Sequence, residues 1–321
     1  MQSTHRALVA IGSMLFAGVV HAQATFGFAT LPPGSLLHAQ ASIMAKVVQD
    51  HSTHQIRVVG FGGDAAALES IGSQKADFMH LDIGETADAF HGRRTWSGNA
   101  KSNLRMVTTL YGFQVGWFVR KDSPIKTIAD LKGKRVPSGW VAHVGNIPHT
   151  EAMLAAGGVT YKDVVNVPAV NVVRAADDFK SGKLDTFTFA VGAPKVAEVA
   201  AGVNGLRLLP VDDTSETLAR MKAVRQEYYI GSAMPAPHVA GVEAPTKVMT
   251  FDLVLFASSH VKDEVVYDIT KAIHGNKKSL SEGHPSFNQF DPAGAAKLQP
   301  SVPHHPGAIR FYKEIGLWRG Q

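Results

Sequence analysis

The segment 25–48 constrains the fold more than any other stretch, because it contains a strand, a loop and a helix in immediate succession. The apolar run Phe26–Ala29 predicts a short buried strand, which the prolines and the glycine that follow bring to an end. Ser35 is predicted to cap a helix, since apolar residues recur at helical spacing from Leu36 to Val48. In open α/β sheets such a loop lies at the carboxyl end of a strand, where backbone N–H groups face a crevice. We therefore expect this segment to form the first wall of a ligand-binding cleft.

The same order of strand, turn and helix recurs along the next part of the chain. Ile56–Phe61 predicts a strand, Gly62-Gly63 a tight turn, and Asp64 the N-cap of the following helix. Ala76–Leu81 predicts another strand, which ends at Asp82 before a further helix. Alternation of this kind is typical of parallel βαβ units. The sequence therefore predicts an α/β fold whose sheets are rich in parallel strands.

Two segments far apart in the sequence match each other. Ser73–Asp77 followed by Gly84 has the same Ser, Lys, Asp and Gly, at the same spacing, as Ser181–Asp185 followed by Gly192. Each segment is expected to end a helix, enter a hydrophobic strand and break at the glycine. A chance match is the alternative, because S-x-K-x-D is also a common surface turn. The position of the match in both halves favours two lobes of similar βα design.

The order of the predicted elements indicates two crossings between these lobes. Leu104–Leu110 and Val115–Arg120 are expected to form a strand pair around Tyr111-Gly112, and Val248–Ala257 to return the chain to the first lobe. Two crossings make a hinge. The expected division is lobe 1, which is discontinuous and comprises residues 25–115 and 246–321, and lobe 2, which comprises residues 116–245.

Residues 1–24 have the features of an export signal. Arg6 supplies a short positive region, Ala7–Val20 an apolar core, and Ala22-Gln23-Ala24 a cleavage motif, with cleavage after Ala22 as the alternative. A membrane anchor is the other interpretation, but the apolar core is short for a bilayer and is interrupted by glycine and serine. The mature protein is therefore expected to be periplasmic and not embedded in the membrane.

Composition and motifs exclude several classes of protein. The chain has no cysteine, which excludes disulfides, thiolate metal sites and a cysteine nucleophile. The formal net charge of +5 is modest for 321 residues and the basic residues are scattered, so nucleic acid is not expected as a partner. A nucleophile elbow, a Walker loop and a complete dinucleotide-binding motif are all missing from the sequence. No catalytic residue and no cofactor are therefore predicted.

The histidines are numerous but do not form a metal-binding motif. None of the fifteen shows H-x-x-x-H or H-E-x-x-H spacing on a predicted helix. His304 and His305 are adjacent between two prolines, so their side chains are expected to diverge and to have a structural role. No metal ligand is predicted, although a site assembled from distant residues stays open.

Further segments resemble known families of binding proteins. Thr127–Val136, which reads TIADLKGKRV, resembles a signature widespread in type II periplasmic binding proteins. The TAXI family comprises the solute receptors of one branch of tripartite ATP-independent periplasmic (TRAP) transporters, and four segments are similar to it: Leu110-Tyr111, Gly192–Pro194, Pro303–Ala308 and Arg310–Gly316. The resemblance implies a Venus-flytrap fold, a small organic solute as ligand and TRAP membrane subunits as partners.

Two loops depart from the family pattern in the same way. The loop from Ser138 to Asn146 is usually polar and glycine-rich but here contains bulky residues, and Leu31–Leu36 lacks the usual Gly/Thr-rich composition. Both changes add apolar surface beside the expected cleft. They favour a ligand that has an apolar or aromatic body, in addition to the carboxylate that such clefts can hold.

The candidate ligand-binding residues share a position at the expected cleft. Hydroxyl groups and the N–H groups of helix starts can hold a carboxylate, whereas Asp82 can receive an amine or a hydroxyl. Structural alternatives stay open, namely an N-cap for Asp82, the core for Tyr111, bonds within the loop for His143 and Asn146, and a plain turn at residues 190–192. Trp140 is expected to contact the ligand or the other lobe. The predicted set is Thr30, Ser35, Leu36, Gly62, Gly63, Asp82, Tyr111, Ser138, Trp140, His143, Asn146, Val191 and Gly192.

These features predict a periplasmic solute-binding protein that captures a small, carboxylate-bearing organic solute by closure of its lobes. By resemblance, it would deliver this solute to TRAP membrane subunits. Two alternatives stay open, a ligand-sensing subunit for a membrane signalling partner and an exported enzyme on a binding-protein scaffold.

Overall fold

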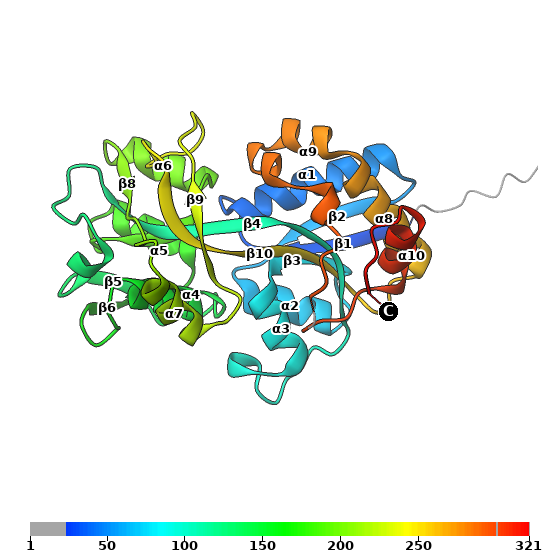
Figure 1. Cartoon of the computed structure of the whole chain (residues 1–321), viewed down its shortest axis with the longest axis horizontal. Helices are drawn as coiled ribbons and strands as arrows, with labels where there is room; N and C mark the ends of the chain where they lie inside the picture. The colour runs from blue at the N-terminus through cyan, green and yellow to red at the C-terminus, as the bar shows by residue number, and fades with distance from the viewer. Residues whose placement is uncertain (1–23, 300, 321) are drawn as a thin grey trace, which may run out of the picture.

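The computed structural model describes residues 24–299 and 301–320, and these form two lobes side by side (Figure 1). We use lobe 1 for residues 25–115 and 246–321, and lobe 2 for residues 116–245. The export signal expected in residues 1–24 lies almost wholly outside the described residues. Among the helices that are described, none is both long and apolar enough to cross a membrane.

Lobe 1 begins with three βα units, as the alternating pattern predicts. Their strands form the parallel part of the sheet in the order β2-β1-β3. Figure 1 shows α1 on one side of these strands and α2 and α3 on the other. The elements are β1 (Thr25–Thr30), α1 (Leu36–His51), β2 (Gln55–Gly60), α2 (Asp64–Gly72), β3 (Phe78–Asp82) and α3 (Ile83–His91), followed by the 3-10 turn η1 (Arg94–Trp96).

Two long antiparallel strands connect the lobes. β4 (Leu104–Arg120) passes from lobe 1 into lobe 2, and β10 (Thr246–Ser258), which is counted with lobe 1, pairs along its first half with β9 (Tyr229–Ala233) of lobe 2. The prediction of a strand pair that turns at Tyr111-Gly112 is wrong, because β4 continues through these residues opposite Leu253 and Asp252. Gly112 serves close packing instead, since a Cβ atom there would lie 2.5 Å from the hydroxyl of Tyr229.

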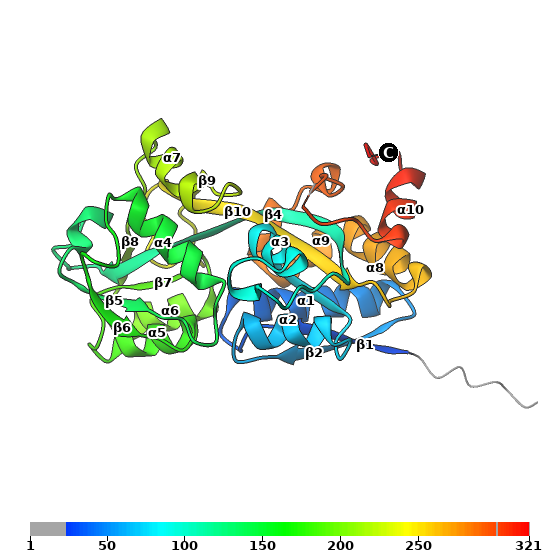
Figure 2. The same ribbon diagram turned by 90° about the horizontal axis from the view of Figure 1, so that it is seen from below.

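Lobe 2 is a smaller α/β unit attached to the far ends of β4 and β10. Strands β7 and β8 pair with β4, β9 pairs with β10, and β5 and β6 form a separate parallel pair. Figure 2 shows α4 and α7 on one side of this lobe and α5 and α6 on the other. The elements are η2 (Ile128–Leu131), β5 (Arg135–Ser138), α4 (Asn146–Ala156), β6 (Val165–Pro168), α5 (Val172–Lys180), β7 (Phe187–Ala190), α6 (Pro194–Gly202), β8 (Leu206–Leu208), α7 (Ser215–Val224) and β9 (Tyr229–Ala233).

The matching Asp residues make the same contact in both lobes. Asp77 Oδ2 accepts a hydrogen bond of 2.7 Å from the backbone N–H of Gly27 in β1. Asp185 Oδ2 accepts one of 2.8 Å from the backbone N–H of Arg135 in β5. In each lobe, an aspartate just before a buried strand, β3 or β7, is therefore bound to a neighbouring strand, β1 or β5, which agrees with the predicted similarity of design.

The C-terminal segment returns to lobe 1 and packs on its outer side. His305 donates its backbone N–H to Met106 O at 2.8 Å, and its imidazole Nε2 lies 3.0 Å from Val261 O. The His304-His305 pair therefore has a structural role in the described structure, as expected. The elements of this segment are α8 (Asp263–Gly275), α9 (Lys277–Gly283), η3 (Pro285–Gln289), η4 (Pro292–Gly294) and α10 (Pro306–Glu314).

Candidate ligand-binding cleft

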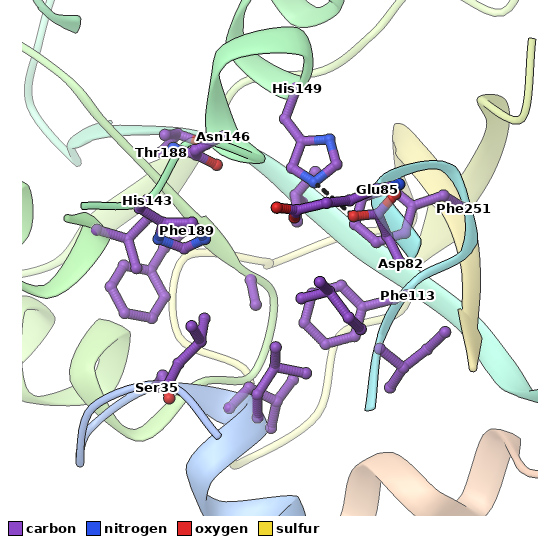
Figure 3. A pocket seen from close by; sticks show the side chains of 18 residues that line it. Ser35, Asp82, Glu85, Phe113, His143, Asn146, His149, Thr188, Phe189 and Phe251 are labelled. Carbon is purple, nitrogen blue, oxygen red and sulfur yellow. Dashed lines mark hydrogen bonds and ion pairs between the residues drawn. The ribbon is translucent and has the colours of Figure 1, made fainter. Parts of the chain in front are cut away.

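A cavity of about 60 Å³ lies between the two lobes (Figure 3). Lobe 1 contributes the loop before α1, the start of α3 and the middle of β4 and β10, whereas lobe 2 contributes the start of α4 and the end of β7. Much of the wall is apolar and includes Leu31, Leu36, Leu37, Phe113, Phe189 and Phe251. The polar side chains are Ser35, Asp82, Glu85, His143, Asn146, His149 and Thr188. The cavity thus has a mostly apolar wall, with acidic and other polar side chains gathered at one end.

Asp82 is both the N-cap of α3 and part of the cavity wall. Its Oδ1 accepts a hydrogen bond of 2.8 Å from the backbone N–H of Glu85 and one of 3.0 Å from the guanidinium of Arg225. Its Oδ2 is buried without a hydrogen-bond partner and lies 3.6 Å from His149 Nε2. The N-cap interpretation is confirmed for Oδ1, and Oδ2 remains free to accept a hydrogen bond from a ligand.

Arg225 brings a positive charge from lobe 2 to the start of α3. Its guanidinium also donates to Asp88 at 2.8 Å, and this contact is buried. Gly84 makes the approach possible, because a Cβ atom there would lie 2.4 Å from Cδ of Arg225. This ion pair joins the lobes behind the cavity, and Arg225 does not line the cavity itself.

Burial raises the pKa values of the two carboxyl groups at the polar end. The pKa of Asp82 rises to about 6, because desolvation outweighs the attraction of Arg225. The pKa of Glu85 lies well above its usual value, because desolvation is reinforced by the nearby carboxyl groups of Asp64 and Asp82. Glu85 Oε1 is buried without a hydrogen-bond partner.

Asp64 joins the two lobes directly. It was predicted to cap α2, but the N-cap of α2 is Gly63, and the Asp64 side chain points across the cleft. Its carboxyl oxygens accept hydrogen bonds of 2.8 Å from Val144 N–H and 2.9 Å from Gly145 N–H, at the start of α4. Asn171 of lobe 2 also donates its side-chain amide to Gly62 O at 2.8 Å. The structure therefore shows the lobes in contact.

His149 forms the wall opposite Asp82. Its ring stacks on Phe251 with centroids 4.6 Å apart, and its Nδ1 lies 2.6 Å from the hydroxyl of Tyr228. Burial lowers the pKa of His149 well below its usual value, and the charge of Arg225 lowers it further. His149 is therefore neutral near pH 7 and acts as a hydrogen-bonding group rather than a cation.

Five of the predicted ligand-binding residues line the cavity: Ser35, Leu36, Asp82, His143 and Asn146. Gly62 and Gly63 lie at the contact between the lobes, and a Cβ atom on Gly63 would lie 1.7 Å from Ala142 O. Both glycines therefore act in lobe contact rather than in the cavity wall.

The other predicted residues lie outside the cavity wall. Trp140 is fully buried, donates its indole N–H to Thr150 Oγ1 of lobe 2 at 3.2 Å, and is not part of the cavity wall. Tyr111 is a core residue of lobe 1 that accepts a hydrogen bond from Gln40, and burial raises the pKa of its hydroxyl to about 12. The remaining members of this group are Thr30, Ser138, Val191 and Gly192.

Sequence reasoning missed several residues of the wall, although local signals for them exist. Glu85 follows Asp82 by one helical turn and so faces the same side of α3. Phe113 and Val115 alternate with outward positions along β4, as residues of one strand face must. His149 and Phe251 meet only through tertiary packing and carry no local signal.

The two lobes, the long strands that join them and the cavity between them define a solute-binding protein fold. PhnD1 from Prochlorococcus marinus, solved in complex with methylphosphonate, superposes with a TM-score of 0.57 at 12% identity and covers 91% of this chain and 98% of its own. AbpA from Streptococcus pneumoniae, an amino acid ABC transporter substrate-binding protein bound to L-arginine, gives 0.51 at 12% identity over 83% and 95%. The predicted two-lobed α/β fold is therefore confirmed.

The chain belongs to the NMT1-like family, whose model matches residues 28–316. This match covers nearly all of both lobes. The match shows this family and does not distinguish the TAXI group, which the C-terminal motif resembles.

Proposed function

We propose that this protein is a periplasmic receptor that captures a small organic solute between its lobes and delivers it to a membrane transporter. The observation that carries this proposal is the cavity between the lobes with its unpartnered buried polar atoms, namely Asp82 Oδ2, Glu85 Oε1 and Asn146 Nδ2. Leaving such atoms unpaired costs about 1–3 kcal/mol each, so a ligand that pairs them gains binding energy. The apolar wall then selects the body of the solute.

Closure of the lobes would provide both affinity and selectivity. Each lobe supplies only part of the wall, so an open form contacts the solute from one side alone. The contacts of Asp64 with α4 and of Arg225 with α3 would form together on closure. A wrong solute would leave polar groups unpaired in the closed cavity and would be rejected.

Transfer to TRAP membrane subunits is a separate part of the proposal. It rests on the resemblance of the C-terminal block, Pro303–Ala308 and Arg310–Gly316, to the TAXI family. Uptake by whole cells tests it, because a protonophore or a sodium ionophore stops transport driven by an ion gradient. Uptake that survives collapse of the gradients and stops on ATP depletion would instead assign the receptor to an ATP-driven transporter.

Denaturing extraction of the protein purified from a bacterial periplasm tests solute capture. We expect mass spectrometry to find a stoichiometric small molecule, and we expect that molecule to raise the melting temperature of stripped protein in a concentration-dependent way. Chemical change of the molecule during incubation would show an enzyme. A protein that carries no solute, and that no compound of a broad solute library stabilises, would contradict the proposal.

A further inference from the structure

The charges around the cavity point to the chemistry of the solute. We propose that it carries a protonated amine or amidine group on an apolar body, and that this group binds between Asp82 and Glu85. The inference rests on the proposed function and replaces the carboxylate expected from sequence. Four observations on the described residues support it.

The first observation concerns the cations near the cavity. Lysine and arginine are absent from the described wall of the cavity. Arg225 lies behind Asp82 and already donates to Asp82 and Asp88, at 3.0 and 2.8 Å. The ring of His149 is held neutral by burial, as described above. His143, the other histidine of the wall, already faces Asp64, with its Nε2 3.4 Å from Asp64 Oδ2. An anionic solute would therefore find no lysine or arginine in the described wall, and no histidine without an acidic neighbour.

The second observation concerns the backbone groups that would suit an anion. The start of α4 offers N–H groups and the positive end of a helix, but Val144 and Gly145 donate to the two oxygens of Asp64. A side chain of lobe 1 thus occupies the position that a solute carboxylate would need. A second carboxylate there would also be repelled by the like charge of Asp64.

The third observation concerns the unpaired acceptors. Asp82 and Glu85 are each only 2% exposed, and each keeps one oxygen without a hydrogen-bond partner. Figure 3 shows the two carboxyl groups side by side at one end of the cavity, facing His149. An ammonium or amidinium group supplies N–H donors and a compensating charge, whereas a carboxylate supplies neither.

The fourth observation concerns the body of the solute. Phe113, Phe189 and Phe251 line the cavity, together with several leucines. A volume of about 60 Å³ is less than half of the roughly 150 Å³ cavity that holds benzene in a protein interior, so the lobes as they stand suit a short alkyl chain, and a ring requires some separation of the lobes. A larger body would require the lobes to stand further apart.

A matched set of probes on one ring tests the head group. Benzamidinium, benzylammonium, benzyl alcohol and benzoate are titrated into the stripped protein by calorimetry at pH 7.5. We expect at least one of the two cations to bind more than tenfold tighter than the alcohol, and benzoate to show no binding. Tighter binding of benzoate, or no binding of either cation, overturns the proposed head group.

A proton balance gives a second readout in the same experiment. Glu85 is faced by Asp64, Asp82, Arg225, His143 and His149, and its pKa is raised by burial. A bound cation stabilises the ionised carboxylates, so binding should release protons, and the measured heat should change with the ionisation enthalpy of the buffer. Proton uptake on binding would contradict the assignment.

Glu85→Gln provides the matched variant, because it keeps the shape of the side chain and removes its charge. We expect it to weaken cation binding more than tenfold, while Glu282→Gln, the same change on an exposed residue of α9, leaves affinity unchanged. Equal affinities in the two variants overturn the assignment even if Glu85→Gln folds normally by circular dichroism. The proposed function is tested apart from this, since a periplasm-derived solute of any other charge would support capture and refute only the head group.

Discussion

Replacement of Gly63 by alanine should hold the two lobes apart. A Cβ atom at this position would lie 1.7 Å from Ala142 O and 2.3 Å from Ala142 C, both across the cleft. Gly63 has an extended backbone, with φ −176° and ψ 177°, so alanine can adopt the same conformation without strain. The effect of the substitution is therefore steric and acts on lobe contact alone.

The magnitude follows from the contacts that would separate. Ala142 must retreat by roughly 1.8 Å or more to reach an ordinary van der Waals distance of about 3.5 Å. A shift of this size breaks the hydrogen bonds from Val144 and Gly145 to Asp64, now 2.8 and 2.9 Å long. Each such bond to a charged group contributes about 1.5–3 kcal/mol, so closure becomes less favourable by about 3 kcal/mol or more. Apparent affinity for the solute should fall by about 100-fold.

Gly62→Ala is the matched control, because a Cβ atom at Gly62 meets nothing within 4 Å. Both variants reduce the flexibility of the unfolded chain to the same degree. Small-angle X-ray scattering should show a larger radius of gyration for Gly63→Ala with solute than for Gly62→Ala with solute, and calorimetry should show the loss of affinity. Equal scattering and equal affinity in the two variants would refute closure at this contact.

Three further predictions concern the core, the pH dependence of stability and the N-terminus. Trp140→Phe should lower the melting temperature through lost packing in lobe 2 and leave solute affinity within about twofold, because the indole does not reach the cavity; a specific loss of affinity would contradict this. Burial lowers the pKa of His80 to about 3, so between about pH 6 and pH 3 the unfolded chain binds a proton at this residue that the folded chain does not bind. As the pH is lowered through this range, the free energy of unfolding should therefore fall by up to about 1.4 kcal/mol per pH unit. Urea titrations of His80→Leu should show a shallower decline than the same substitution at exposed His51, and identical slopes would exclude His80 as the cause. Mass spectrometry of the exported protein should find Thr25, or alternatively Gln23, as the first residue, and retention of residues 1–24 would contradict signal cleavage.

The local pattern of the sequence was enough for the elements that begin lobe 1. Ser35 caps α1 as predicted, since its hydroxyl accepts a hydrogen bond of 3.1 Å from His38 N–H. Capping and helical periodicity involve neighbours in the sequence, so they can be recognised without tertiary information. Asp82 was also recognised as a helix cap from its local pattern, and its Oδ1 does accept a hydrogen bond from Glu85 N–H. Its position at the end of a strand also places it in the cavity wall.

The side on which an aromatic ring is buried could not be predicted in this way. Trp140 lies in a loop next to the cleft, but its ring turns inward to Thr150, which the fold brings close. Tyr111 lies on β4 near the cavity, but its ring packs against Phe287 from the C-terminal segment. Both partners are set by packing between elements, and only the complete fold decides which way such a ring points.

Asp64 shows a different limit of sequence reasoning. An aspartate after two glycines and before an apolar helix has the local signature of an N-cap. In the structure, the carboxyl group serves the start of α4 in the other lobe. An acidic side chain that accepts hydrogen bonds from the N–H groups at a helix start was therefore correctly expected. The helix, however, is α4 of the other lobe and not α2, which directly follows Asp64.

The continuity of β4 and β10 between the lobes determines how the molecule can move. A connection made of two paired strands resists bending more than a flexible loop does, because bending deforms a ladder of hydrogen bonds and stores elastic energy. The register of this ribbon shifts at Leu253/Val254, and such irregularities are where strands bend and twist most readily. Leu253 also lines the cavity. A solute captured in the cavity would therefore touch the ribbon next to this irregularity, and elastic recoil of the ribbon would help to release it once the contacts between the lobes are broken.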